Sequence, residues 1–323
     1  MPDIDDIRAA AGRIRGHARV TPFLNNPLLD ERIGKRIYVK AECLQRTGSF
    51  KFRGAWSAIS NLEPESRKQG VIAFSSGNHA QGIAHAATLH GIPSVIVMPK
   101  DAPQIKIRNT RNLGAEVVLY DRDDESREAF AEEIMKTRPL TLIKPFDTAD
   151  VLVGQGTTGL EIAAQAKEVG IDEADVNVCC GGGGLTAGIA LALEADAPKM
   201  TVRPAEPEGF DDVSRSQQLG SIQRNNRATG SIQDAILTPA VGDLPWPVIR
   251  RLCGDGHVIS DDETLHAMAL AFHYLKIVVE PGGATGLAAS FFRPTEADTI
   301  IAVATGGNVD RHIFRQALDT LDT

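Results

Sequence analysis

The chain of 323 residues alternates between short apolar runs, many of them β-branched, and longer segments in which apolar residues recur at helical spacing. This alternation is typical of parallel strands joined by helical crossovers, so the sequence predicts an α/β fold. The expected strands are 37–39, 71–74, 94–98, 116–119, 142–143, 176–179, 202–205 and 300–304. The expected helices are 80–89, 104–113, 125–136, 160–169, 185–193 and 263–274. The stretch 211–247 lacks clear periodicity and is interpreted as a functional or interfacial loop.

Size and composition narrow the class of protein. The chain is longer than the roughly 250–300 residues at which single cores stop growing, so two lobes are expected. The formal net charge is −8 without a long basic run, which excludes nucleic acid as an expected partner. No apolar stretch is long enough to span a bilayer, and the acidic start lacks the apolar segment of a secretory signal. We therefore expect no membrane partner and a cytoplasmic location.

A run of four glycines, Gly181–Gly184, follows one apolar run and precedes a helical segment. Consecutive glycines in a strand–loop–helix context let backbone N–H groups converge on a phosphate at the helix N-terminus. A merely flexible turn is the alternative interpretation. The run matches neither the dinucleotide fingerprint nor the phosphate loop of nucleotide hydrolases, which disfavours both classes of ligand.

Lys51 lies between two aromatic residues, Phe50 and Phe52, after Ser49. A lysine that is partly desolvated has a lowered pKa, and its free amine can form a Schiff base with an aldehyde. We expect Ser49 to cap the helix whose first turn carries Lys51. Most lysines beside aromatic residues are simply exposed at the surface, so this residue alone decides nothing.

Two further polar segments follow expected strands. Residues 75–79, Ser-Ser-Gly-Asn-His, open a helix and would direct N–H groups and hydroxyls at an anion such as a carboxylate. Plain helix capping by Ser76 or Asn78 is the simpler alternative. Residues 305–308, Thr-Gly-Gly-Asn, follow the last expected strand, where the carboxyl ends of parallel strands form the usual ligand crevice.

These four segments, in this order and spacing, resemble the fold-type II pyridoxal-phosphate enzymes, specifically the serine/threonine dehydratase (ammonia-lyase) and serine racemase family. The resemblance runs along nearly the whole chain. It implies a two-domain, tryptophan-synthase-β-like α/β architecture in which each domain is a largely parallel sheet flanked by helices. Residues 1–69 and 148–323 would form the large domain, which binds pyridoxal phosphate, and 70–147 the small substrate-binding domain. A homodimer is also implied.

The resemblance assigns roles to individual residues. Lys51 would form the Schiff base with pyridoxal 5′-phosphate, and Ser76 would face the opposite side of the substrate Cα. Phe50 would pack near the pyridine ring, Asn78 would hydrogen-bond the 3′-oxygen, and Thr305 would lie beside the pyridine nitrogen. The residues implied to hold the phosphate are Gly181, Gly182, Gly183, Gly184 and Leu185. The residues implied to meet the substrate are Ser75, Ser76, Gly77, Asn78, His79 and Arg127.

An acidic segment at 205–212 resembles the metal-binding stretch of serine racemase-like members. There, the carboxylates of Glu206 and Asp212 and the backbone carbonyl of Phe210 would bind Mg²⁺ or Ca²⁺ together with waters. Solvated loop carboxylates are the alternative. Arg127 would bind a second substrate carboxylate, as in 3-hydroxyaspartate, unless it is a solvated helix arginine.

The activity implied is pyridoxal-phosphate-dependent β-elimination, which converts a β-hydroxy amino acid of the L-serine or L-threonine type to a 2-keto acid and ammonia. Serine or aspartate-type racemisation and 3-hydroxyaspartate ammonia-lyase activity are alternatives on the same site, and racemisation is also a possible side activity. β-Replacement, as in cysteine synthases, is disfavoured by segment 75–79 and the acidic loop. A non-catalytic cofactor-binding protein is disfavoured because Lys51, the glycine run and Thr305 are all present.

Overall fold

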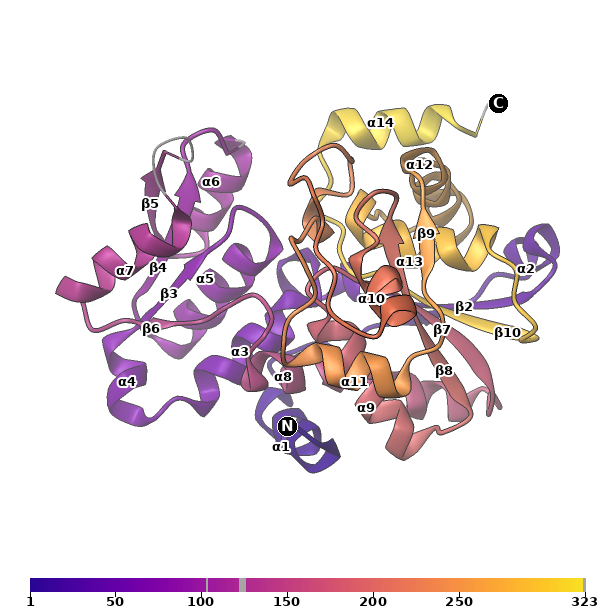
Figure 1. Cartoon of the computed structure of the whole chain (residues 1–323), viewed down its shortest axis with the longest axis horizontal. Helices are drawn as coiled ribbons and strands as arrows, with labels where there is room; N and C mark the ends of the chain where they lie inside the picture. The colour runs from indigo at the N-terminus through magenta and orange to yellow at the C-terminus, as the bar shows by residue number, and fades with distance from the viewer. Residues whose placement is uncertain (103, 122–125, 322–323) are drawn as a thin grey trace.

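The computed structural model of the protein contains two β-sheets (Figure 1). The structure describes residues 1–102, 104–121 and 126–321, and of Arg127 it describes only the backbone. The larger sheet has the order β1-β2-β10-β7-β8-β9: β1 (Phe23–Leu24), β2 (Arg36–Lys40), β10 (Thr299–Val303), β7 (Ala174–Cys179), β8 (Met200–Pro207) and β9 (His257–Ile259). The smaller sheet has the order β5-β4-β3-β6: β5 (Glu116–Tyr120), β4 (Ser94–Pro99), β3 (Val71–Phe74) and β6 (Thr141–Leu142). All neighbouring strands pair in parallel except β1 with β2.

Helices pack against both faces of each sheet. One face of the larger sheet packs against α1 (Ile4–Ile14), α8 (Ala149–Glu168), α9 (Gly184–Asp196) and α11 (Pro245–Leu252). The other packs against α2 (Pro27–Ile33), α12 (Asp261–Leu270), α13 (Pro281–Phe292) and α14 (Arg311–Asp319). The smaller sheet lies between α3 (Lys51–Asn61), α5 (Asn78–His90) and α6 (Gln104–Asn112) on one face and α7 (Arg127–Thr137) on the other. The predicted α/β class is confirmed.

The remaining elements are short. They are the helices α4 (Pro64–Gln69) and α10 (Asp212–Leu219), the 3₁₀ turns η1 (Glu42–Leu44), η2 (Arg46–Gly48) and η3 (Asp234–Ile236), and the π turn η4 (Ala271–Leu275). Every residue of β3, β4, β7 and β10 is buried, because helices cover both faces of these strands. None of the helices that the structure describes is both long and apolar enough to cross a bilayer.

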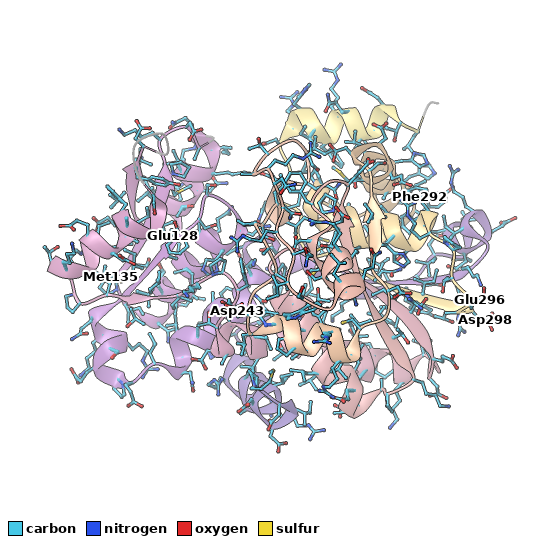
Figure 2. All side chains as sticks on the ribbon, viewed as in Figure 1. Glu128, Met135, Asp243, Phe292, Glu296 and Asp298 are labelled. Atoms are coloured by element: carbon cyan, nitrogen blue, oxygen red, sulfur yellow. The ribbon has the colours of Figure 1, made fainter. Side chains whose placement is uncertain are left out.

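The two sheets occupy opposite halves of the molecule in Figure 1, the smaller one on the left. Figure 2 shows Glu128 and Met135 on that half, with Met135 nearer its outer end, Phe292, Glu296 and Asp298 on the other half, and Asp243 near the middle. All strands of the smaller sheet fall between residues 71 and 142, and the larger sheet uses strands from before and after that segment. The domain limits 1–69 with 148–323, and 70–147, remain a prediction.

Glycines bring three helices unusually close together. A Cβ on Gly154 of α8 would lie 2.7 Å from the carbonyl oxygen of Arg53 in α3, and one on Gly156 would lie 2.9 Å from the carbonyl oxygen of Gly188 in α9. Glycine disfavours helix formation, so the packing of these backbones has to compensate for the local propensity. Helix α8 begins at Ala149, so the predicted helix 160–169 covers only its second half.

Two further expectations differ from the structure. The stretch 211–247 contains α10 and the start of α11, so its interpretation as a loop was wrong at both ends. Helix α10 begins where the carboxylate of Glu206 in β8 receives hydrogen bonds from the helix's N–H groups, a tertiary contact that periodicity does not reveal. The predicted helix 125–136 begins at Arg127 in the structure, and residue 125 lies outside the described residues.

Candidate active site

The carboxyl ends of strands from both sheets meet at one cavity of about 530 Å³. Strand β3 ends just before Ser75, β7 just before the glycine run, and β10 just before Thr305. The cavity brings together the following predicted residues: Phe50, Lys51, Ser75, Ser76, Gly77, Asn78, His79, Gly181, Gly182, Gly183, Gly184, Leu185 and Thr305. The predicted metal residues do not line it.

The start of α3 places Lys51 in this cavity. The helix cap is Phe50, which has no side-chain capping bond, so the expectation that Ser49 caps the helix was wrong. Ser49 is instead extended and fully buried, and its backbone pairs with Gly306. The N–H of Phe50 donates to the carbonyl oxygen of Thr305 at 3.1 Å. The residues before Lys51 are thereby joined to the end of β10.

The ammonium group of Lys51 is enclosed. Its Nζ donates to the carbonyl oxygen of Pro145 at 3.0 Å and lies 4.9 Å from the centre of the Phe50 ring. Burial lowers the pKa of Lys51 from its ordinary value to about 8. About a tenth of the amine is then neutral at pH 7, far more than for an ordinary lysine, and this is the form that attacks an aldehyde and removes a proton.

The glycine run forms the N-terminus of α9. Gly183 has a left-handed φ of 85° and is the helix cap, and no side chain caps the helix. The first N–H groups of α9 and the positive end of its dipole therefore face the cavity, an arrangement that suits a phosphate. The buried hydroxyl of Thr238 lines the same cavity and has no hydrogen-bond partner in the described chain. These groups fit the phosphate of pyridoxal phosphate.

Asn78 belongs to a chain of amides that ends at a carboxylate. Its Nδ2 donates to Glu280 Oε1, and its Oδ1 accepts from Asn308 Nδ2 at 2.7 Å. Asn308 Nδ2 also donates to the carbonyl oxygen of Thr47 at 2.8 Å. The amide of Asn78 is therefore held in one orientation, with a second hydrogen on Nδ2 left for a ligand.

Glu280 is a site residue that the sequence interpretation missed. It lines the cavity and is 5% exposed. Burial raises its pKa to about 7, although the hydrogen bond from Asn78 opposes this rise. A signal was present, because Glu280 is the only charged residue in the apolar stretch 277–292. Buried charged residues with perturbed pKa values in a cavity are candidates for function.

The segment 75–79 presents three different polar groups. Ser75 Oγ accepts from the N–H of Gly77 at 3.2 Å, whereas Ser76 has no hydrogen-bond partner among the residues described. His79 is buried, and its Nε2 lies 2.9 Å from the carbonyl oxygen of Ile143, so Nε2 carries the proton. Burial, and to a smaller degree the charge of Lys51, lower the pKa of His79 to about 3. His79 is therefore neutral.

Thr305 lies beside a thiol. Its Oγ1 is 2.9 Å from Sγ of Cys179, the last residue of β7. Burial raises the pKa of Cys179 to about 11, so the thiol stays neutral and Thr305 has an uncharged partner. The sequence interpretation did not single out Cys179, because cysteines are commonly just buried apolar residues.

The predicted metal segment lies apart from the cavity. Glu206 is fully buried and accepts from the N–H groups of Val213 and Ser214, both at 2.8 Å. Asp212 accepts from the N–H of Val241 and from Asn225 Nδ2, both at 2.7 Å. No group of three or more His, Cys, Asp or Glu side chains in the described ranges is placed to hold a metal ion. Two buried carboxylates fit part of an oxygen-ligand set for Mg²⁺ or Ca²⁺.

Arg127 cannot be placed against the substrate, because its side chain lies outside the described residues. A cation that does line the cavity is Lys106 in α6, which the sequence interpretation missed. Its Nζ lies 3.2 Å from Asp234 Oδ2 in η3. This ion pair connects the small-sheet half with the large-sheet half beside the cavity.

Comparison with known proteins identifies similar chains over almost the whole length. Residues 14–306 match the family described as pyridoxal-phosphate dependent enzyme. An L-threo-3-hydroxyaspartate ammonia-lyase of Pseudomonas is 42% identical over 307 residues, which cover 94% of this chain and 95% of that protein. Among solved structures, a threonine deaminase from T.th. has a TM-score of 0.90 and 41% identity, covering 96% of this chain and 99% of that one. Maize serine racemase has a TM-score of 0.90 and 37% identity, covering 99% and 97%.

Proposed function

Since the chain belongs to the family of pyridoxal-phosphate-dependent enzymes, we propose that it converts a β-hydroxy amino acid of the L-serine or L-threonine type to a 2-keto acid and ammonia. The predicted family, fold type and enzyme class are confirmed by relatives named ammonia-lyase, deaminase and racemase. The proposed reaction needs no oxidant: water leaves in the elimination and returns in the hydrolysis, so serine yields pyruvate and ammonia.

One observation carries the proposal. The buried amine of Lys51 and the uncapped N-terminus of α9 share a single cavity. This pairing places a reactive amine and a phosphate cradle in one enclosed space, which is what binding of pyridoxal phosphate requires. When bound, pyridoxal phosphate withdraws electrons from an amino acid and makes its Cα proton acidic.

The protein's own groups account for binding and proton transfer. The backbone N–H groups of α9 hold the phosphate, and the N-terminus of α5, which no side chain caps, receives the substrate carboxylate. The neutral amine of Lys51 removes the Cα proton, and its lowered pKa keeps this form available near neutral pH. The cavity encloses these groups, which strengthens their electrostatic contacts.

Racemisation is the second candidate activity. The hydroxyl of Ser76 lines the cavity and has no partner in the described part of the chain, so it is available to donate a proton to Cα. Maize serine racemase resembles the chain over nearly its whole length. Donation from the side opposite Lys51 would invert the configuration.

A dicarboxylic substrate is favoured by Lys106, a cation of the cavity wall that could pair with a second carboxylate. The Pseudomonas relative is named for L-threo-3-hydroxyaspartate. Arg127 would contribute a further positive charge. This candidate differs from the serine type only in the substrate side chain, and both use the same reactive groups.

A divalent cation, a homodimer and a cytoplasmic location complete the proposal. Glu206, Asp212 and the carbonyl oxygen of Phe210 would bind Mg²⁺ or Ca²⁺ at the start of α10. The ion would fasten α10 to β8.

The decisive experiment is an assay of 2-keto acid and ammonia release by purified protein with pyridoxal phosphate and Mg²⁺. The substrates are L-serine, D-serine, L-threonine and L-threo-3-hydroxyaspartate. Equal amounts of keto acid and ammonia from at least one of them support the proposal and rank the substrates. No keto acid from any, with D-serine accumulating from L-serine, would replace elimination by racemisation as the main activity.

A further inference from the structure

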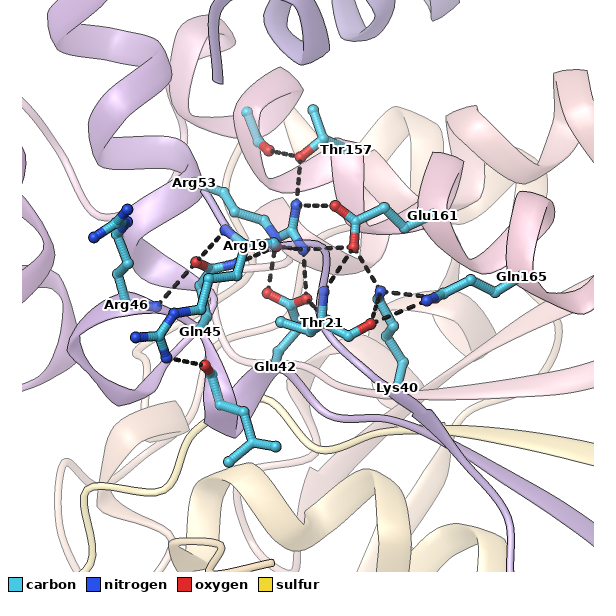
Figure 3. A network of polar contacts seen from close by, with 12 residues as sticks. Arg19, Thr21, Lys40, Glu42, Gln45, Arg46, Arg53, Thr157, Glu161 and Gln165 are labelled. Atoms are coloured by element: carbon cyan, nitrogen blue, oxygen red, sulfur yellow. Dashed lines mark hydrogen bonds and ion pairs between the residues drawn. The ribbon is translucent and has the colours of Figure 1, made fainter. Parts of the chain in front are cut away.

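A buried network of charged side chains holds the helix that begins at Lys51 (Figure 3). Arg53, two residues after Lys51, is fully buried. Its guanidinium donates to the two oxygens of Glu42 at 2.7 and 2.6 Å and to the two oxygens of Glu161 at 2.7 and 2.8 Å. Two bidentate pairs leave the planar guanidinium a single orientation.

Lys40 completes the network. Its Nζ donates to Glu161 Oε2 at 2.5 Å, to Gln165 Oε1 at 2.8 Å and to the carbonyl oxygen of Thr21 at 2.9 Å, which uses all its hydrogens. The hydroxyl of Thr21 donates to Glu42 Oε1 at 2.6 Å. Two cations and two anions balance, so no net charge is buried.

The network connects four elements of the fold. Lys40 ends β2, Glu42 begins η1, and Glu161 and Gln165 lie one turn apart on α8. Arg53 is the contribution of α3. The network therefore fixes α3 against a strand of the larger sheet and against α8 at the same time.

Lys51 and Arg53 point to opposite sides of α3. Residues two apart in an α-helix are separated by about 200° around its axis. Accordingly Lys51 lines the cavity and Arg53 does not. Helix α8 also carries Gln155, whose Nε2 lies 3.5 Å from the carbonyl oxygen of Pro145, the acceptor of the Lys51 hydrogen bond. Helix α8, whose Glu161 binds Arg53, thus also contacts the carbonyl oxygen of Pro145 that accepts a hydrogen bond from Lys51.

The first turn of α3 has no capping side chain to fix it. The backbones of α3 and α5 lie close together at this turn, since a Cβ on Gly82 of α5 would lie 3.2 Å from the carbonyl oxygen of Lys51. Such contacts limit how near the helices approach. The hydrogen bonds of Arg53 are directional, so they also favour one orientation of α3 about its axis.

We propose that Arg53 is a positioning residue, which through Glu42 and Glu161 fixes the rotation of α3 and so holds the Lys51 amine in the enclosed part of the cavity. Buried ion pairs are poor sources of stability, because apolar side chains of equal volume often stabilise as well. Their directional bonds nevertheless define a geometry. The inference rests on the proposed function only in taking Lys51 as the reacting amine.

The test measures the pKa of the Lys51 amine in the full-length protein without added cofactor. Competitive acetylation with acetic anhydride at a series of pH values, read by mass spectrometry of the Lys51 peptide, gives this pKa without substrate or turnover. The variant is Arg53→Lys, which keeps the charge but cannot bridge both carboxylates in the bidentate manner. The Lys51 pKa should rise from about 8 by about 1 unit as water reaches the amine. Burial is the main cause of this pKa and Arg53 is not among its causes, so the change would report a movement of Lys51 and not the substituted charge.

Arg293→Lys is the matched control. Arg293 also pairs with both oxygens of a glutamate, Glu263, at 2.5 and 2.7 Å, and neither residue lines the cavity. The control should lower the melting temperature and leave the Lys51 pKa unchanged.

If Arg53→Lys does not fold, Glu161→Gln serves instead, because Glu161 is 17% exposed and tolerates the change better. An unchanged Lys51 pKa in the folded variant, alongside a lowered melting temperature, would overturn the proposal. Absence of keto-acid release in the wild type would contradict the proposed function and leave this result standing.

Discussion

The side-chain amide of Asn78 donates a hydrogen bond to the buried carboxylate of Glu280. The contact joins the first residue of α5 to the residue that precedes α13, so it bridges the small-sheet and large-sheet halves across the cavity. It also places a titratable group beside Asn78, the residue that would hydrogen-bond the 3′-oxygen of the cofactor. The ionisation of Glu280 is therefore coupled both to the stability of the fold and to binding of the cofactor.

Stability should fall with rising pH because of Glu280. The folded pKa of about 7 lies above the ordinary value, so the folded state holds the proton more tightly than the unfolded state does. The resulting stabilisation is complete below about pH 4.5 and is lost as pH rises through about 7, on the order of 3 kcal/mol. Thermal unfolding of Glu280→Gln between pH 5 and 8 should show a smaller decrease than the wild type.

The neighbours of Glu280 make the comparison specific. Asp234 and Asp310 raise its pKa and Lys106 lowers it, and all three stay in place in the variant. Glu65→Gln is the control, because Glu65 is exposed and pairs with Lys68 at the surface. Its pH profile should run parallel to that of the wild type. A parallel profile for Glu280→Gln as well would show that Glu280 is ionised throughout this range.

Substitution of Ser76 should impair proton transfer at one face of the substrate Cα and leave the other face unaffected. Ser76→Ala removes a hydroxyl of the cavity wall that has no partner in the described part of the chain. The variant should lose racemisation and activity on D-serine by about a hundredfold or more, as is usual for acid–base groups. Keto-acid release from L-serine should persist, since Lys51 remains. Chiral chromatography and a keto-acid assay on the same samples check this. Equal loss on both enantiomers would contradict a face-specific proton donor.

The contact between α8 and α3 at Gly154 leaves no room for a side chain, so adding one should destabilise the protein. An added Cβ would lie 2.5 Å from Ser57 Cβ and 2.7 Å from the backbone oxygen of Arg53, which cannot move aside freely. Gly154→Ala should lower the free energy of unfolding by about 3 kcal/mol. Gly12→Ala in α1 is the matched control, because its Cβ would meet nothing within 4 Å. It should stabilise by up to about 1 kcal/mol. Similar results for both would contradict the close approach of α3 and α8.

Added Mg²⁺ should raise the melting temperature if Glu206 and Asp212 bind it. Binding to the folded state alone stabilises by about 2.7 kcal/mol at a hundredfold excess over Kd. Asp212→Asn keeps an oxygen for the Val241 N–H but loses the charge, so its melting temperature should not respond to Mg²⁺. Differential scanning fluorimetry with Mg²⁺, Ca²⁺ and Na⁺ checks this. An equal Mg²⁺ response in the variant would remove Asp212 from the ligand set.

The alternation in the sequence predicted most of the fold. All eight expected strands are present, and the missed ones, β1 and β9, are short edge strands with little apolar run to detect. Helix α13 was missed because it is apolar on every side, which erases helical periodicity. The first half of α8 was missed because its glycines serve contacts with α3 and α9 that have no local signature.

The candidate site was predicted where the sequence carries a local motif. Glycine runs and strand-end polar segments identify the cavity wall, because parallel strands bring their carboxyl ends together. Glu280 and Lys106 come from helix starts without such a motif, and only the folded chain shows that they face the same cavity. The Arg53 network joins Lys40, Glu42 and Arg53 to Glu161, which lies 108 residues after Arg53, so its charge balance was equally hidden.

The central claim is that Lys51 binds pyridoxal phosphate covalently. The direct measurement is borohydride reduction of the cofactor-loaded protein, followed by mass spectrometry of its peptides. We predict a phosphopyridoxyl adduct on Lys51, and loss of both the adduct and the visible absorbance band in Lys51→Ala. An adduct on another lysine such as Lys106, with the absorbance band retained in Lys51→Ala, would contradict the account.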